Sequence, residues 1–109
     1  MTDYSALLDD EVWAFLNESA RYYPDDAVGL RIEDQRALYN KMCVAFDQGR
    51  PANITVKDVP LGGVPCRVYS PAAPAVATIF FCHGGGFVVG GLDSHDSVCA
   101  EFCSITGLR

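Results

Sequence analysis

The feature that most constrains the fold is an apolar segment, residues 76–82, that is followed after His83 by three consecutive glycines, 84–86. Thr78 is the only clearly polar residue in this segment, so polar and apolar residues do not alternate along it. A strand that is apolar on both faces lies inside a sheet, with helices above and below it. Glycines leave backbone amides uncovered and adopt positive φ readily. The pattern therefore predicts an α/β fold in which a buried strand leads into a loop with exposed amides.

Periodicity and turn residues predict the remaining elements. Two N-terminal segments carry apolar residues at helical spacing, which packing alone explains, and Pro24 and Gly49 supply their stop signals. Two β-branched segments flank the Gly62-Gly63 pair, and Pro65 places the second of them at a sheet edge or a bulge. The predicted elements are helices over about 3–23 and 32–48, strands over 54–59 and 64–69, and a helix over 94–106 that Asp93 or Ser94 caps and Gly107 ends.

Composition and charge exclude several classes of partner. The 109 residues fit one small domain, and 50% of them are hydrophobic. A net charge of −6 argues against nucleic acid and anionic membranes, and no apolar run is long enough to span a bilayer. The acidic N-terminus has no signal-peptide pattern, and the five cysteines lack a C-x-x-C spacing. We therefore expect reduced thiols in a cytoplasmic protein, and a homo-oligomer stays open.

Ser94, His95 and Asp96 contain the residue types of a catalytic triad. Because they are consecutive at the start of a helix, we expect their side chains to point in different directions and to form no relay. Capping of the helix explains them more simply, with Asp96 in the favourable first turn. The sequence contains no Gly-x-Ser-x-Gly, and His95 is its last histidine, so the order Ser, acid, His cannot be built.

Neither a metal nor a nucleotide cofactor is expected. The glycines fit neither the Gly-x-Gly-x-x-Gly nor the Gly-Lys-Ser/Thr fingerprint of phosphate loops. Cys99 and Cys103 share one face of the last predicted helix, where buried packing explains them better than metal binding or oxidation. A second set of metal-ligand residue types has a spacing that matches no zinc pattern. That set is Cys82, His83, Asp93 and His95.

The order of motifs resembles the hormone-sensitive-lipase-like branch of the α/β-hydrolases, which includes bacterial carboxylesterases and acetyl esterases. The match begins with Gly-Val-Pro-Cys-Arg-Val-Tyr-Ser-Pro at 63–71 and the apolar segment. His-Gly-Gly-Gly-Phe at 83–87 follows, and then Gly90 and the His-Asp pair at 95–96. The two N-terminal helices resemble the cap of this family. The resemblance extends over nearly the whole chain.

The resemblance implies the fold class: the N-terminal part of an α/β-hydrolase. Its parts are two cap helices, a β-hairpin, a central strand, an oxyanion loop and a helix, and its sheet is incomplete in this chain. Residues 1–50 would form the helical cap segment, and residues 51–109 the first strands and first helix of the core. Because the central strand needs a parallel partner beside it, we expect the remainder of the hydrolase domain beyond Arg109.

The resemblance also implies a role for each residue of the loop. The backbone N–H groups of Gly85 and Gly86 would hold the oxyanion of an ester undergoing acyl transfer. The other roles are bracing by His83, a sharp turn at Gly84, support from Asp96 and a substrate pocket lined by Phe87. The implied function is part of a serine carboxylesterase for short- to medium-chain esters, inactive alone and without a cofactor. The alternative is a non-catalytic ligand-binding protein on the same scaffold.

Overall fold

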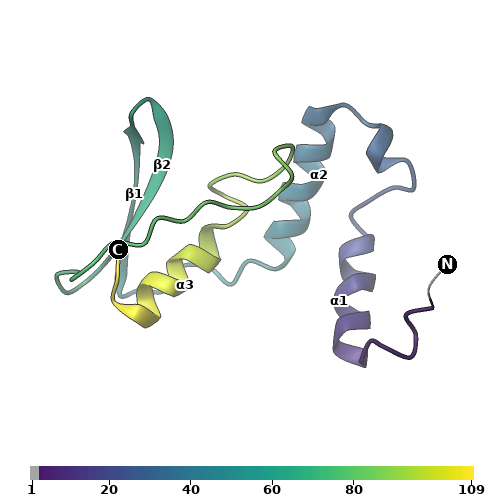
Figure 1. Ribbon diagram of the computed structural model, residues 1–109, viewed down its shortest axis with the longest axis horizontal. Helices are drawn as coiled ribbons and strands as arrows, with labels where there is room; N and C mark the ends of the chain where they lie inside the picture. Colours follow the sequence, from purple (N-terminus) through teal and green to yellow (C-terminus); the bar gives the residue numbers. More distant parts are fainter. Residues whose placement is uncertain (1–2) are drawn as a thin grey trace.

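The computed structural model describes residues 3–109, so Met1 and Thr2 of the predicted N-terminal segment lie outside the described residues. The hairpin and α3 pack together at one end of an elongated molecule, and α1 and α2 lie at the other (Figure 1). The chain between β2 and α3 crosses from the hairpin to α2 and returns. In chain order, the elements are α1 (Asp10–Ala20), the 3-10 turn η1 (Ala27–Gly29), α2 (Ile32–Ala45), β1 (Ile54–Leu61), β2 (Val64–Pro71) and α3 (Asp96–Thr106).

β1 and β2 form the predicted antiparallel hairpin. Leu61 pairs with Val64, which leaves Gly62 and Gly63 as a two-residue loop with φ of +58° and +82°. Positive φ at both positions is the type I′ turn, whose twist matches that of the flanking strands. Each strand continues two residues beyond its predicted end. The glycine pair therefore sets the register of the whole hairpin.

The helices are shorter than the periodicity predicted. α1 starts at Asp10 because the Asp9 side chain caps it, accepting a hydrogen bond from the Val12 amide at 2.9 Å. It ends three residues before the predicted end at 23, and α2 likewise ends at Ala45 instead of 48. α3 starts two residues later than predicted and ends as predicted at Gly107, which has a φ of +69°. The η1 turn lies between the two predicted N-terminal helices.

The predicted capping of α3 is wrong. His95 occupies the N-cap position, and no side chain there bonds to the first turn. The Asp93 carboxylate instead accepts a hydrogen bond from Arg67 at 2.9 Å. The Ser94 hydroxyl accepts one from the Gly91 amide at 2.8 Å. Both candidate caps are thus used to hold the chain in front of the helix.

Residues 76–82, which were predicted to form a buried strand, belong to no strand in the structure. The Ile79 amide donates to the Arg109 carbonyl at 2.7 Å, and the Arg109 amide donates to the Ala77 carbonyl at 3.1 Å. Two bonds from one residue to alternate residues of another segment are the start of a parallel ladder. Phe80 is 82% exposed and Phe81 is 47% exposed. Only Arg109 pairs with this backbone within the described residues, which explains the missing strand.

The packed core is small and belongs to α3. Within residues 3–109, the buried hydrophobic side chains are those of Ala100 and Cys103, on the face of α3 that meets the hairpin. A groove of about 1020 Å³ lies between β2, the chain over 78–92 and α3. No helix within these residues is long and apolar enough to cross a membrane. The fold therefore places the glycine loop at the junction of the hairpin, α3 and α2.

Candidate functional site

The glycine loop over 83–91 contains a cluster of left-handed backbone conformations. Gly85, Gly86 and Gly90 have φ of +134°, +60° and +93°. Phe87 also has a φ of +60°, and it is the only residue other than glycine with positive φ in the described chain. A bulky residue at positive φ is strained, and such strain persists only where the surrounding structure fixes it. The conformation of this loop is therefore determined by its contacts with the surrounding chain.

The carbonyl groups of the first two glycines are held by hydrogen bonds within the loop. His83 Nδ1 lies 2.7 Å from the Gly84 oxygen. Because a carbonyl oxygen only accepts, Nδ1 carries the hydrogen and donates it. The Gly85 oxygen accepts from the amides of Val88 and Val89, each at 3.0 Å. Both oxygens are thus fixed by donors from the same loop.

Fixing these two carbonyls also fixes two amides. In a trans peptide the C=O and N–H groups point in opposite directions, and the described chain contains no cis peptide. The Gly84 carbonyl and the Gly85 amide belong to one peptide unit, and the Gly85 carbonyl and the Gly86 amide belong to the next. Within residues 3–109, no hydrogen bond uses the amides of Gly85 and Gly86. Two oriented and unoccupied donors on consecutive residues suit an oxygen atom that becomes negatively charged.

Two positions in the loop have no room for a side chain. A Cβ at Gly85 would collide with the carbonyl oxygen of Val89. A Cβ at Gly90 would lie 2.9 Å from His83 Nδ1 and 3.0 Å from the oxygen of Gly84. Gly90 therefore lets the backbone approach the imidazole and the carbonyl that the imidazole holds. The sequence predicted that glycine is needed in this loop, but it did not show which atoms require it.

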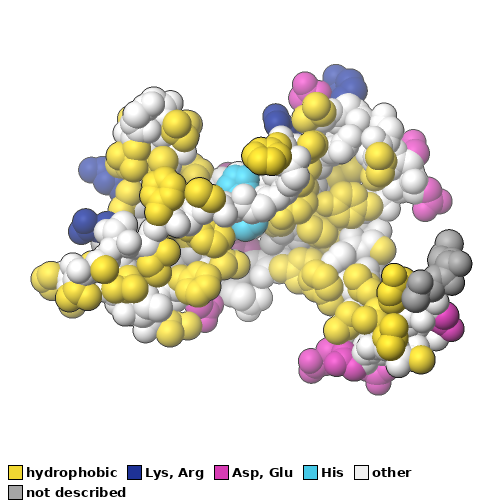
Figure 2. Space-filling model, in the orientation of Figure 1, with side chains coloured by type: hydrophobic (Ala, Val, Ile, Leu, Met, Phe, Trp, Pro, Cys, Tyr) yellow, Lys and Arg dark blue, Asp and Glu magenta, His cyan; other side chains and the backbone are white. Residues whose placement is uncertain are grey.

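The two histidines of the chain lie side by side (Figure 2). The ring centroids of His83 and His95 are 4.9 Å apart and the rings are nearly parallel, at 24°. Burial and the neighbouring His83 lower the pKa of His95. An imidazole with a lowered pKa stays neutral at neutral pH, which allows the rings to stack without charge repulsion.

The side chains of Ser94 and His95 are in contact, contrary to the expectation that neighbouring side chains diverge. Ser94 Oγ lies 2.9 Å from His95 Nδ1, and it also bonds the amide and the carbonyl of Gly91. Asp96 does not join them, because its carboxylate points to the hairpin. The expectation that the three form no relay holds, since Ser94 is fully engaged and the acid faces elsewhere.

Asp96 is the centre of an ion cluster, not simply a favourable charge in the first turn of α3. Its side chain is 12% exposed. Arg50 binds it through two nitrogens, at 2.7 and 3.1 Å. Arg67 donates to one carboxylate oxygen at 2.9 Å, and Tyr69 donates its hydroxyl to the same oxygen at 2.8 Å. Burial raises the pKa of Asp96, but the hydrogen bonds from Arg50, Tyr69 and Arg67 outweigh it and hold that pKa below its usual value.

Arg67 extends the cluster across the hairpin. Its side chain is 10% exposed and binds Asp58, its cross-strand partner, at 2.6 and 3.0 Å. It also binds Asp93 at 2.9 Å. The hydrogen bonds to Asp58 contribute most to raising the pKa of Arg67. Burial and the bond to Asp96 raise the pKa of the Tyr69 hydroxyl, so it remains a neutral donor. The cluster joins β1, β2, α3 and, through Asp93, the short segment between the loop and α3.

Sequence reasoning missed the roles of Arg50, Arg67 and Tyr69. A usable signal was present for two of them, since Arg67 and Tyr69 are two residues apart on a strand and therefore share one face. Charged and phenolic groups on the side that faces α3 require a partner, and Asp96 is the acid at the start of that helix. Arg50 carried no such signal, because it lies in an irregular connection.

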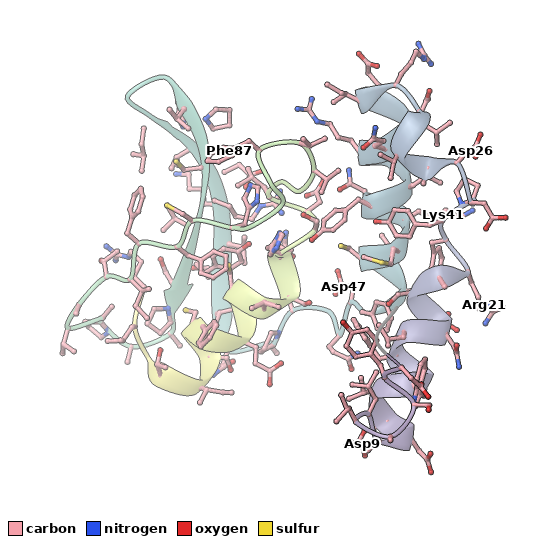
Figure 3. The ribbon with its side chains drawn as sticks, turned by 45° about the vertical axis from the view of Figure 1, so that its right-hand side comes forward. Asp9, Arg21, Asp26, Lys41, Asp47 and Phe87 are labelled. Atoms are coloured by element: carbon pink, nitrogen blue, oxygen red, sulfur yellow. The ribbon has the colours of Figure 1, made fainter. Side chains whose placement is uncertain are left out.

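The far end of the loop reaches the N-terminal helices and the groove. Arg36 on α2 donates from Nε to the Val88 carbonyl at 2.6 Å. The Phe87 side chain, labelled in Figure 3, is fully exposed and borders the groove of about 1020 Å³. Its predicted place in a substrate pocket stays a prediction. Within residues 3–109 no group of three or more metal-ligating side chains is placed to hold an ion.

Comparison with known proteins gives one consistent group of relatives. The chain is 34% identical over 103 residues to an acetyl esterase of Salmonella paratyphi B, and 33% identical to one of Salmonella typhi. Each match covers 92% of this chain and 32% of the relative, so the chain spans about a third of the length of these curated relatives. No protein-family model matches the chain.

A solved structure shows the same arrangement of elements. The crystal structure of an esterase from the bacterial hormone-sensitive lipase family superimposes with a TM-score of 0.75. The match has 20% sequence identity and covers 94% of this chain and 33% of that structure. At this identity the comparison establishes the fold, and the sequence matches supply the relationship to acetyl esterases.

Proposed function

We propose that the chain belongs to the hormone-sensitive-lipase-like α/β-hydrolases and is the N-terminal part of a serine carboxylesterase, which supplies the oxyanion hole. Residues 1–50 would form a helical cap, and residues 51–109 the first strands, the oxyanion loop and the first core helix. The observation that carries the proposal is the pair of unoccupied amides at Gly85 and Gly86, whose directions are set by the held carbonyls of Gly84 and Gly85.

The proposed chemistry is acyl transfer. A serine supplied by the rest of the enzyme attacks the ester carbonyl, and the carbonyl oxygen becomes an oxyanion. The Gly85 and Gly86 amides donate to that oxygen and stabilise the developing charge without having to reorganise. His83 and Gly84 support this geometry, as does Asp96 through the ion cluster. The chain alone lacks the nucleophile, the acid and the base, so we expect it to be inactive.

The groove supports the expected substrate class. It is lined mainly by apolar residues of β2, the loop and α3, and it lies beside the two amides. Such a site suits the acyl or alcohol part of a short- to medium-chain ester, with Phe87 at its border. We propose no cofactor or metal, and no nucleic-acid or membrane partner. A cytoplasmic location stays a prediction.

The test is an esterase assay of the full-length protein with p-nitrophenyl acetate and butyrate. We expect saturable turnover that a serine-directed phosphonate abolishes, and no turnover by residues 1–109 alone. A full-length protein that binds these esters without turning them over would contradict the proposal and support the ligand-binding alternative. Phosphonate-sensitive turnover by the 109-residue chain would contradict the division of roles.

Gly85→Ala tests the loop itself. The added Cβ meets the Val89 carbonyl, so the peptide that carries the Gly85 amide has to turn. We expect kcat to fall about a hundredfold, as for loss of one oxyanion donor. Gly29→Ala is the matched control, because a Cβ at Gly29 meets nothing within 4 Å and its φ is ordinary. Equal kcat for the two variants would show that Gly85 is not a donor.

A further inference from the structure

We propose that His95 is a positioning residue of the oxyanion loop: its ring holds the His83 imidazole in the orientation that fixes the Gly84 carbonyl and thereby the Gly85 amide. This inference rests on the proposed function, because it assigns a purpose to the direction of that amide. His95 touches no substrate in this scheme. It acts through His83, whose Nδ1 lies 2.7 Å from the Gly84 oxygen.

The His83 ring needs support from outside its own segment. Its residue is exposed to solvent, and it follows a stretch, 76–82, that no neighbouring strand holds in place within the described residues. Besides its hydrogen bond to Gly84, the ring lies beside the His95 ring, at 4.9 Å between centroids, and close to Gly90, where a Cβ would lie 2.9 Å from Nδ1. A rotation of the imidazole about its side-chain bonds would break the hydrogen bond to Gly84.

His95, by contrast, is held on several sides. Ser94 Oγ lies 2.9 Å from its Nδ1. The rings of Tyr39 and Phe81 have centroids 6.4 and 6.2 Å from the centroid of its ring. The next residue, Asp96, is bound by donors from the hairpin and the connection before it. The more constrained imidazole therefore sets the position of the more exposed one.

Two aspects of the side chain can be separated by substitution in the full-length protein. His95→Phe keeps a flat ring for stacking and loses the nitrogen that contacts Ser94. His95→Asn keeps a polar atom near the position of Nδ1 and loses the ring. We expect His95→Asn to lower kcat about tenfold with KM within twofold, because a misplaced donor weakens the transition state more than substrate binding. His95→Phe should retain kcat within about threefold.

Opposite results would overturn the inference: full kcat in His95→Asn, or a loss in His95→Phe that equals that in His95→Asn. A raised KM with unchanged kcat would also overturn it, since it indicates a substrate contact. A second readout needs no activity. In full-length protein labelled with 15N-glycine, we expect the Gly85 amide resonance to shift in His95→Asn and to stay near its wild-type position in His95→Phe. An unshifted resonance in both overturns the inference, whereas absent turnover in wild type contradicts only the proposed function.

Discussion

The glycine loop is attached to two parts of the molecule in very different ways. On the core side, Asp96 and Arg67 form an ion cluster whose two central side chains are 12% and 10% exposed. On the helical side, Arg36, an exposed residue of α2, donates a hydrogen bond to the Val88 carbonyl, and the Tyr39 ring of the same helix stacks beside His95. Buried charges are costly unless they are paired, so such a cluster tolerates few alternative geometries. The loop therefore takes its orientation mainly from the hairpin and α3, and α2 makes the weaker contribution.

The largest expected effect comes from breaking the core attachment. Asp96→Asn removes the charge that Arg50, Arg67 and Tyr69 share, and it leaves Arg67 with fewer anionic partners in a mostly buried position. We expect a loss of about 2 kcal/mol in the free energy of unfolding of the full-length protein, measured in urea. Asp58→Asn is the control, because its side chain is 59% exposed and its loss should be much smaller. Equal losses of unfolding free energy in Asp96→Asn and Asp58→Asn would mean that the cluster does not anchor α3.

The next largest effect is a pH dependence: the stability that Asp96 contributes should decrease in acid. The pKa of Asp96 is lowered in the folded state, so its contribution to stability is complete above the unfolded pKa and disappears as the pH falls through the folded pKa. The difference in unfolding free energy between wild type and Asp96→Asn should therefore be constant from pH 7 to about pH 5 and shrink below that. The other titratable groups are common to both proteins, so their contributions to the pH dependence cancel in this difference. A difference that grows in acid would contradict the assigned direction.

The smallest effect should come from breaking the helical attachment. Arg36→Ala removes the hydrogen bond to Val88, and kcat/KM of the full-length enzyme should change by less than about threefold, as for a solvent-exposed hydrogen bond. Arg31→Ala on the same helix is the control, since Arg31 pairs with Asp34 and has a side chain that is 78% exposed. A tenfold loss in Arg36→Ala alone would show that α2 orients the loop as strongly as the hairpin does.

The sequence was most informative where a residue type is demanded locally. Gly62 and Gly63 predicted the hairpin turn, and Gly107 predicted the end of α3, because positive φ is a property of single residues. The glycines after 76–82 likewise predicted an exposed-amide loop. The strand predicted before these glycines is different, because a strand forms only beside a partner strand. Within the described residues, only Arg109 forms backbone hydrogen bonds with this segment.

The ion cluster could not be predicted because its members lie far apart in sequence. Asp96 is 46 residues from Arg50 and 29 from Arg67, and local rules assigned it to the first turn of a helix. The same rules assigned Ser94 to a cap, whereas the structure uses its hydroxyl for Gly91 and His95. Local propensity thus located the elements, and tertiary contacts decided what their polar side chains do.

The three adjacent glycines of the loop impose different limits on substitution. At Gly85 a Cβ would strike the Val89 carbonyl, so any side chain there moves the backbone. At Gly86 a Cβ meets nothing within 4 Å, and its φ of +60° is one that Phe87 also adopts. At Gly84 the space is open and φ lies outside the left-handed region. Tolerance to substitution should therefore differ along the motif. Gly85 should accept no side chain, Gly86 should be limited by its backbone angle, and Gly84 should have space for a side chain.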